Sequence, residues 1–191
     1  MKNIKISIIA FALIMATAIS CNNSSNKNNA KTNNENRIAT ENNTVTKSFS
    51  IAPIVNNYLA LKNALVADDS KKAAETGKQL LATLNGVDMS AVPSDKHKRF
   101  MEISNDAKEN AEHIRVNGGN IPHQREHFEY LTKDLEDIIA LFGAPEKLYL
   151  IHCPMYNDGK GADWISSSKE INNPYLGQKM SDCGTVKKEL K

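Results

Sequence analysis

The chain has 191 residues, which is enough for one domain with appended segments. Its formal net charge is only +2, so charge by itself indicates neither nucleic acid nor an acidic protein as a partner. The sequence contains no Gly-rich phosphate loop, no Gly-x-Ser-x-Gly elbow and no His-Glu-x-x-His motif. We therefore expect a protein that is not an enzyme.

Residues 1–20 are typical of a secretory signal peptide. Lys2 and Lys5 form a positively charged start, and an apolar run follows at residues 6–19. This run is too short to span a membrane, and the chain after it is strongly polar. The run leads into an Ala-Ile-Ser-Cys sequence that ends at Cys21 and is similar to the lipobox of bacterial lipoproteins. Cys21 is therefore predicted to carry a lipid anchor, which places the protein in the cell envelope, facing the periplasm. The alternative is an ordinary signal peptide that is cut nearby.

Residues 21–48 form a low-complexity segment that is rich in Asn and poor in aromatic or large apolar residues. Such a composition cannot bury enough apolar surface to offset the entropy of ordering the chain. The segment is predicted to be a disordered tether, and a helical domain with a C-terminal lobe is predicted over residues 49–191.

From residue 49 onward, apolar residues recur at the three- and four-residue steps of amphipathic helices. Four helices joined by short links predict a mainly α protein, an up-down four-helix bundle. The apolar positions are, helix by helix, Ile51, Ile54, Val55, Tyr58, Leu61, Leu65 and Val66; Ala73, Ala74, Gly77, Leu80, Leu81 and Leu84; Phe100, Ile103, Ala107, Ala111 and Ile114; Phe128, Leu131, Leu135, Ile138 and Phe142.

The ends of these helices also have sequence signals. Ser70 is predicted to cap the second helix, and Ser94 or Asp95 the third. The Asn-Gly-Gly-Asn sequence at residues 117–120 predicts a tight turn, and Pro122 fits the first turn of the fourth helix. Gly143 is expected to end that helix.

Residues 146–186 are predicted to form a small, irregular lobe that contains Cys and Met. It starts with a short buried extended run at residues 148–151 and continues through Gly-rich turns. Trp164, Tyr156 and Tyr175 are interpreted as the small core of this lobe, with an aromatic wall over a ligand as the alternative.

The lobe gathers sulfur-containing residues in two arms, Cys153 with Met155 and Met180 with Cys183. Thiolate and thioether donors select copper(I), so these four residues are the predicted ligands of a soft metal ion, and His152 is a fifth candidate. A Cys153–Cys183 disulfide is an equally open alternative. Outside the cytosol disulfides persist, and closing a loop of this length stabilises a fold by roughly 3.6 kcal/mol.

The remaining histidines give a weaker signal. His123 and His127 are four residues apart on one helix face and could share a metal ion, but we interpret them as partly exposed polar residues. His97 and His113 have no partner in the sequence and are predicted to be surface residues.

The segments that carry a further resemblance are Cys-Pro-Met at 153–155, Gly-Ala-Asp-Trp-Ile-Ser at 161–166, Ile-Asn-Asn-Pro-Tyr-Leu-Gly at 171–177, Met180 with Cys183-Gly184, and Gln124-Arg125 with Phe128. They resemble the domain of unknown function 3347 family, from about residue 54 to residue 186. The resemblance implies a secreted or lipid-anchored protein. Because the same domain is found on periplasmic adaptor subunits of heavy-metal efflux pumps, it also implies the handling of copper or silver.

The hypothesis that follows is a lipid-anchored envelope protein that binds copper(I), or another soft heavy-metal ion, as a buffer, a carrier or a partner of an efflux system. The expected partners are the metal ion, the membrane through the lipid at Cys21, and heavy-metal efflux components, but no nucleic acid. The alternative is a non-enzymatic interaction module whose lobe is stapled by the Cys153–Cys183 disulfide.

Overall fold

The computed structural model describes residues 48–191 of the chain. The predicted signal peptide, the predicted lipid attachment at Cys21 and the predicted tether up to residue 47 lie outside the described residues. Within the described part of the chain, no helix has the length and the apolar character that crossing a membrane requires.

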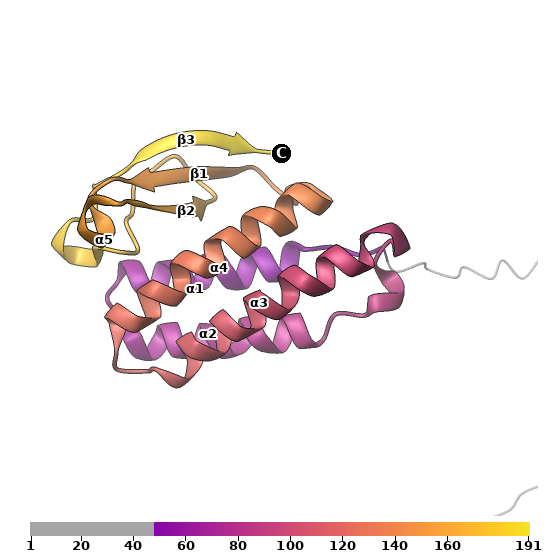
Figure 1. Ribbon diagram of the computed structural model, residues 1–191. Coiled ribbons are helices and arrows are strands. Elements are labelled where there is room, and N and C mark those ends of the chain that lie inside the picture. The colour runs from indigo at the N-terminus through magenta and orange to yellow at the C-terminus, as the bar shows by residue number, and fades with distance from the viewer. Residues whose placement is uncertain (1–47) are drawn as a thin grey trace, which may run out of the picture. The chain divides into compact units, whose positions relative to one another are not determined.

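Four long helices dominate the described residues, and each packs against the helix that follows it in the sequence. Figure 1 shows them running alternately in opposite directions. Their bounds are Ala52–Val66 for α1, Ser70–Asn85 for α2, His97–Val116 for α3 and Ile121–Phe142 for α4. Two short 3-10 turns, Met89–Ala91 and Ser94–Lys96, connect α2 to α3. The expected up-down four-helix bundle is confirmed.

Tyr58 of α1 shows how the bundle is joined to the rest of the domain. Its ring is fully buried and stacks on Phe128 of α4, with 4.9 Å between the ring centroids. Its hydroxyl donates to Thr132 Oγ1 over 2.8 Å, because the Thr132 hydroxyl itself donates to a backbone carbonyl. The same hydroxyl accepts a hydrogen bond from the backbone N–H of Ile165 over 3.1 Å. Both polar contacts are therefore satisfied in the core, and they tie α1 and α4 to the C-terminal lobe.

The cap of α2 differs from the prediction. Asp69, one residue earlier than Ser70, accepts the hydrogen bond from the backbone N–H of Lys72 over 2.8 Å. The Ser70 hydroxyl is instead used in a tertiary contact, since it accepts from the Gly119 N–H and donates to Gln124 Oε1. Either residue type suits a cap, and the long-range partners of Ser70 decide between them.

The start of α3 also differs from the prediction, because neither Ser94 nor Asp95 caps it. The Lys96 N–H donates to the Pro93 carbonyl over 2.9 Å and closes a 3-10 turn. The helix continues directly from that turn at His97, without a side-chain cap. The sequence signals at both ends of α4 are correct, since the turn precedes the helix, Pro122 lies in its first turn and Gly143 follows its last residue with a φ of 86°.

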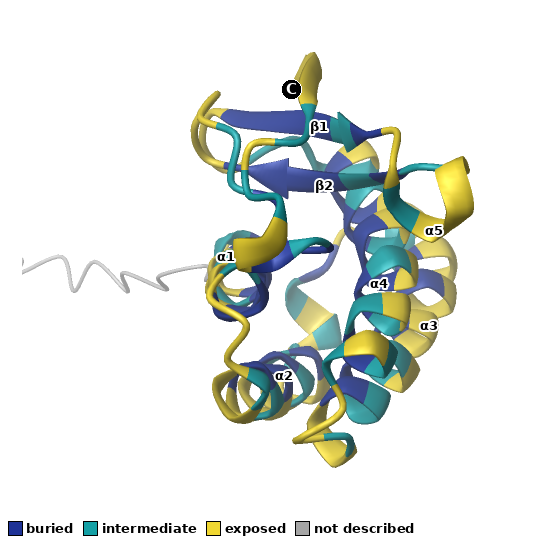
Figure 2. Ribbon diagram, turned by 90° about the vertical axis from the view of Figure 1, so that its left-hand side faces the viewer, coloured by how far each residue is buried: buried dark blue, intermediate teal, exposed yellow. Residues whose placement is uncertain are grey.

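The C-terminal lobe is more regular than predicted, because the described residues include a three-stranded antiparallel sheet. Its strands are Leu148–Cys153 (β1), Ala162–Ser166 (β2) and Thr185–Leu190 (β3), in the order β2-β1-β3. The predicted extended run at residues 148–151 is the first part of β1. Figure 2 shows that β1 and β2 are buried along most of their length, which explains the nearly continuous apolar sequence of β1. The lobe extends to residue 190, four positions beyond the expected end at residue 186.

Candidate functional site

The two cysteines of the lobe meet in space although 30 positions separate them in the sequence. Cys153 is the last residue of β1 and is fully buried, whereas Cys183 lies just before β3 and is half-buried. Their Sγ atoms are 2.7 Å apart, and both cysteines are free. The loop between the two arms folds back, as both the metal hypothesis and the disulfide hypothesis require.

Asn173 holds the second arm in place. Its side chain is completely buried, and its Nδ2 donates to the Cys183 carbonyl over 2.7 Å. Its Oδ1 accepts from the backbone N–H groups of Tyr175 and Leu176 over 2.8 and 2.9 Å. One amide thus closes the turn around Pro174 and fixes the backbone of the second cysteine. An Asn-Pro pair such as residues 173–174 is typical of a turn, but nothing in the sequence indicates the link to Cys183.

The two methionines frame the cysteine pair from opposite arms. Met180 is half-buried, and its carbonyl accepts from the Cys183 N–H over 3.5 Å. Met155 is 59% exposed, and its backbone N–H faces the Cys183 sulfur. The Met155 side chain therefore has to turn inward from solvent before its thioether can reach an ion bound at the cysteines.

His152 does not join the sulfur atoms. Neighbouring residues of a strand point to opposite faces of the sheet, so the side chains of His152 and Cys153 diverge. His152 Nδ1 is 2.7 Å from Asp163 Oδ1, and its ring lies against Gly161, where an added Cβ would come within 2.6 Å of the imidazole. The structure places His152 in a separate polar contact, and the strand period in the sequence already pointed that way.

The Cys183 thiol is held in its protonated form. Burial, and after it the neighbouring Cys153, raises the pKa of the Cys183 thiol to about 11. A metal ion between two thiolates, with metal–sulfur bonds of about 2.3 Å, places the sulfur atoms about 3.8 Å apart in tetrahedral geometry and about 4.6 Å apart in linear geometry. A disulfide needs about 2.05 Å. The observed 2.7 Å lies nearer the disulfide, so the pair must either open for a metal ion or close into a covalent bond.

Arg125 of α4 anchors the lobe to the bundle. Its Nε donates to the Pro174 carbonyl over 2.7 Å, and its Nη2 donates to the Leu65 carbonyl and to Asp68 Oδ1 over 2.9 and 2.6 Å. Asp68 in turn accepts from the backbone N–H of Gln178. This fork fixes the turn that follows Asn173, and so it positions the second cysteine arm from a distance.

The aromatic residues of the lobe are core residues, as interpreted from the sequence. Trp164 is fully buried and Tyr175 is 2% exposed, and their rings meet edge to face at 6.3 Å. Tyr156, in the short α5 segment Tyr156–Gly159, is half-buried and stacks on Tyr175 at 4.5 Å. Trp164 and Tyr175 are thus closed off from a ligand that would need an open aromatic wall.

The histidines of α3 and α4 come together more closely than the sequence suggested. His113 stacks on His127 with 4.1 Å between ring centroids, and His123 meets His127 at 4.6 Å. The prediction that His113 is a surface residue without a partner is therefore wrong. A signal existed, because His113 and His123 stand at similar distances on either side of the predicted turn, where antiparallel helices bring residues together.

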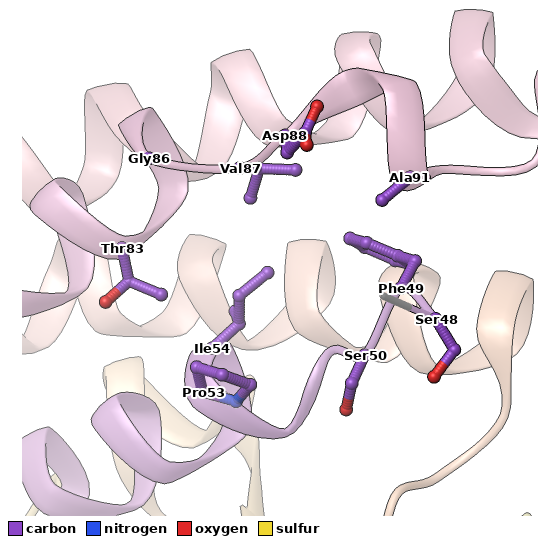
Figure 3. A pocket seen from close by; sticks show the side chains of 10 residues that line it. All are labelled: Ser48, Phe49, Ser50, Pro53, Ile54, Thr83, Gly86, Val87, Asp88 and Ala91. Atoms are coloured by element: carbon purple, nitrogen blue, oxygen red, sulfur yellow. The ribbon is translucent and has the colours of Figure 1, made fainter. Parts of the chain in front are cut away.

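Two hollows lie away from the cysteine pair and from the three histidines of α3 and α4. One, of about 360 Å³, lies where the chain enters α1, and Figure 3 shows Phe49, Ile54 and Val87 turned into it. The other, of about 340 Å³, lies between α4 and the sheet and is lined by polar groups that include His152 and Asp163. Neither hollow is lined by Cys153 or Cys183.

The helical part of the chain matches a known family. Residues 54–147 match the model of the family described as "Protein of unknown function (DUF3347)". The match covers nearly all of the bundle and ends before β1, so the cysteine arms lie outside it. No curated protein matches the chain, and no solved structure does either. The match therefore assigns residues 54–147, the four-helix bundle, to the DUF3347 family.

Proposed function

We propose that this protein is a lipid-anchored protein of the cell envelope that binds a soft transition-metal ion, copper(I) above all, through Cys153 and Cys183. It would act as a buffer, a carrier or a partner of an efflux system. The observation that carries the proposal is the meeting of two distant cysteines, whose Sγ atoms lie 2.7 Å apart in a largely buried place.

The chemistry of the pair suits copper(I). This ion prefers soft thiolate and thioether ligands, and burial excludes competing water. Cys153 is held in β1, but Cys183 lies in a turn, so a rotation of the Cys183 side chain can widen the sulfur–sulfur distance for an ion. Met155 and Met180 are the available thioether ligands. His152 is hydrogen-bonded to Asp163 and is therefore not one of the proposed ligands.

Binding at this pair should release protons. Each cysteine has to lose its proton to bind as a thiolate, and the pKa of the Cys183 thiol is raised to about 11. The affinity for copper(I) is therefore expected to fall on acidification.

The test is an anaerobic titration of the reduced, full-length protein with copper(I) in the presence of a competing chromophoric chelator. Wild type should bind one equivalent, and Cys153→Ser/Cys183→Ser should lose this affinity. Cys21→Ser is the matched control, because it removes the remaining cysteine of the chain and leaves the pair intact. Equal affinity of wild type and the double variant would remove the proposed site. The same Cys21→Ser variant should also leave the membrane fraction if Cys21 carries the anchor.

A second candidate is the interaction module with a Cys153–Cys183 disulfide. The observation that favours it is the same 2.7 Å distance, which is shorter than a metal-bridged pair requires. Mass spectrometry of protein isolated from the envelope without reductant separates the two. A mass that is lower by two hydrogen atoms than that of the reduced chain, with no metal retained, supports the disulfide. The mass of the reduced chain with bound copper supports the metal site.

A further inference from the structure

Three of the five histidines of the chain converge at one end of the bundle. His113 comes from the last turn of α3, and His123 and His127 come from the first two turns of α4. One ligand nitrogen from each lies within 4.8 Å of the other two, and within residues 48–191 this is the only group of three or more such side chains placed to hold an ion. All three residues are half-buried.

The local fold explains why they meet. The turn at residues 117–120 reverses the chain, and the Asn120 side chain accepts from the His123 N–H at the start of α4. His123 and His127 are one helical turn apart and share a face. His113 lies at the matching height on the antiparallel neighbour α3, so its ring completes the group. Two rigid helices therefore hold the three imidazoles, rather than a loop.

A hydrogen-bonded relay prepares His127 to bind an ion. Asn110 Nδ2 donates to Asp134 Oδ2 over 2.9 Å, and this places Asn110 Oδ1 3.0 Å from His127 Nδ1. An amide oxygen only accepts hydrogen bonds, so His127 must carry its proton on Nδ1. The lone pair of its Nε2 is then free. A carboxylate and an amide behind an imidazole are the outer-shell partners that orient histidine ligands in metal sites.

Carboxylates beside the three rings favour a bound cation. Glu126 Oε2 lies 3.3 Å from His123 Nδ1, and the negative charge of the Glu109 carboxylate interacts electrostatically with His127. Beside His123 opens a polar cavity of about 610 Å³ lined by Glu126, Tyr130 and Tyr156, among others.

We propose that His113, His123 and His127 form a metal site that is separate from the cysteines and binds a divalent transition-metal ion, zinc or copper(II). Imidazole nitrogens suit these borderline ions, whereas they do not select copper(I) as thiolates do. Three histidines leave a fourth position open for water or another small ligand, and the cavity beside His123 gives access to it.

The rings need only a small adjustment to close around an ion. Metal–nitrogen bonds of about 2.0–2.1 Å in a tetrahedral site place the nitrogens about 3.4 Å apart. The present limit of 4.8 Å thus shortens by about 1.4 Å when the His113 ring rotates out of its stack on His127.

The site is tested by isothermal titration of the full chain with zinc alone, and by the visible spectrum of its cobalt(II) form. The background is Cys21→Ser/Cys153→Ser/Cys183→Ser, which removes all three cysteines of the chain, so no thiol contributes to the heat or to the absorption. Zinc should bind with one equivalent, and cobalt(II) should give the intense absorption of a tetrahedral site. His113→Asn and His127→Asn should each weaken zinc binding by about tenfold or more, and Asn110→Ala by about 10–100-fold through the lost relay.

The matched control is His97→Gln. His97 is bonded to the Val92 carbonyl over 2.7 Å at the far end of α3, so zinc binding should not change. The proposal is overturned if zinc does not bind in the cysteine-free background. It is also overturned if the His113→Asn and His127→Asn variants bind zinc with the same affinity as the parent. Circular dichroism melts like that of the parent show that these variants are folded. Because the two sites share no residue, loss of copper(I) binding at the cysteines leaves this result unaffected.

Discussion

Gln124 offers the sharpest test of how this bundle is held together. Its amide is fully buried between α2, α3 and α4. Its Nε2 donates to the carbonyls of Ser70 and Ile114 over 3.0 and 3.1 Å, and its Oε1 accepts from the Ser70 hydroxyl over 2.9 Å. Ile114 is among the last four residues of α3, whose carbonyls lack partners within the helix. Gln124 therefore supplies a partner that the helix itself cannot.

The expected cost of removing this amide follows from the three bonds. Each hydrogen bond contributes about 1 kcal/mol, and a buried carbonyl left without a partner adds to the loss. Gln124→Met keeps the length of the side chain and deletes only the polar groups, so we expect it to lower the free energy of unfolding by about 2–4 kcal/mol. Gln124→Ala also removes buried methylene groups and should cost about 1 kcal/mol more.

Urea unfolding followed by far-ultraviolet circular dichroism measures this change, and the fluorescence of Trp164, the only Trp of the chain, reports on the lobe in parallel. Gln79→Ala, at an exposed position of α2, is the control and should change stability by less than about 0.5 kcal/mol. A Gln124→Met variant as stable as wild type would show that the amide contributes nothing and would refute the reasoning.

Three further changes test other parts of the domain. Burial raises the pKa of Asp134 from 3.8 to about 6, so the native state should lose stability as the pH rises through that interval, by about 1 kcal/mol after allowance for partial exposure. Asp134→Asn should flatten this pH dependence of urea unfolding, and an unchanged slope would contradict the assignment. Gly184→Ala would place a Cβ 2.6 Å from the Trp164 ring, so we expect about 1–3 kcal/mol of destabilisation and an altered Trp164 emission. An unchanged melt would show that the ring can move aside without cost. A lysine in Arg125→Lys cannot reproduce a guanidinium that binds three oxygens, one of them on Asp68. Because Asp68 accepts from the Gln178 N–H, hydrogen exchange at this amide should accelerate. An equal exchange rate would mean that Arg125 does not hold the lobe.

Local sequence patterns were sufficient for most of the architecture. The three- and four-residue spacing of apolar residues predicted the four helices, and the apolar run after Pro145 predicted the first strand. Helix caps were less well predicted: Ser70 and Asp69 are both suitable, and only the contact of Ser70 with Gln124 settles which one remains free to cap. The strands β2 and β3 were missed, because short strands with mixed polarity acquire their pairing from β1 and have no distinctive pattern of their own.

For the candidate sites, the sequence by itself determined the chemistry but not its grouping. It placed soft ligands in two arms around Cys153 and Cys183, and imidazoles on the faces of two helices. Only the tertiary structure decided that the two thiols lie 2.7 Å apart, that His152 turns away to Asp163, and that His113 joins the histidines of α4. The physical reason is that periodicity reports how a residue is oriented on its own element. The distance between side chains of different elements depends on how turns and packing set those elements against each other.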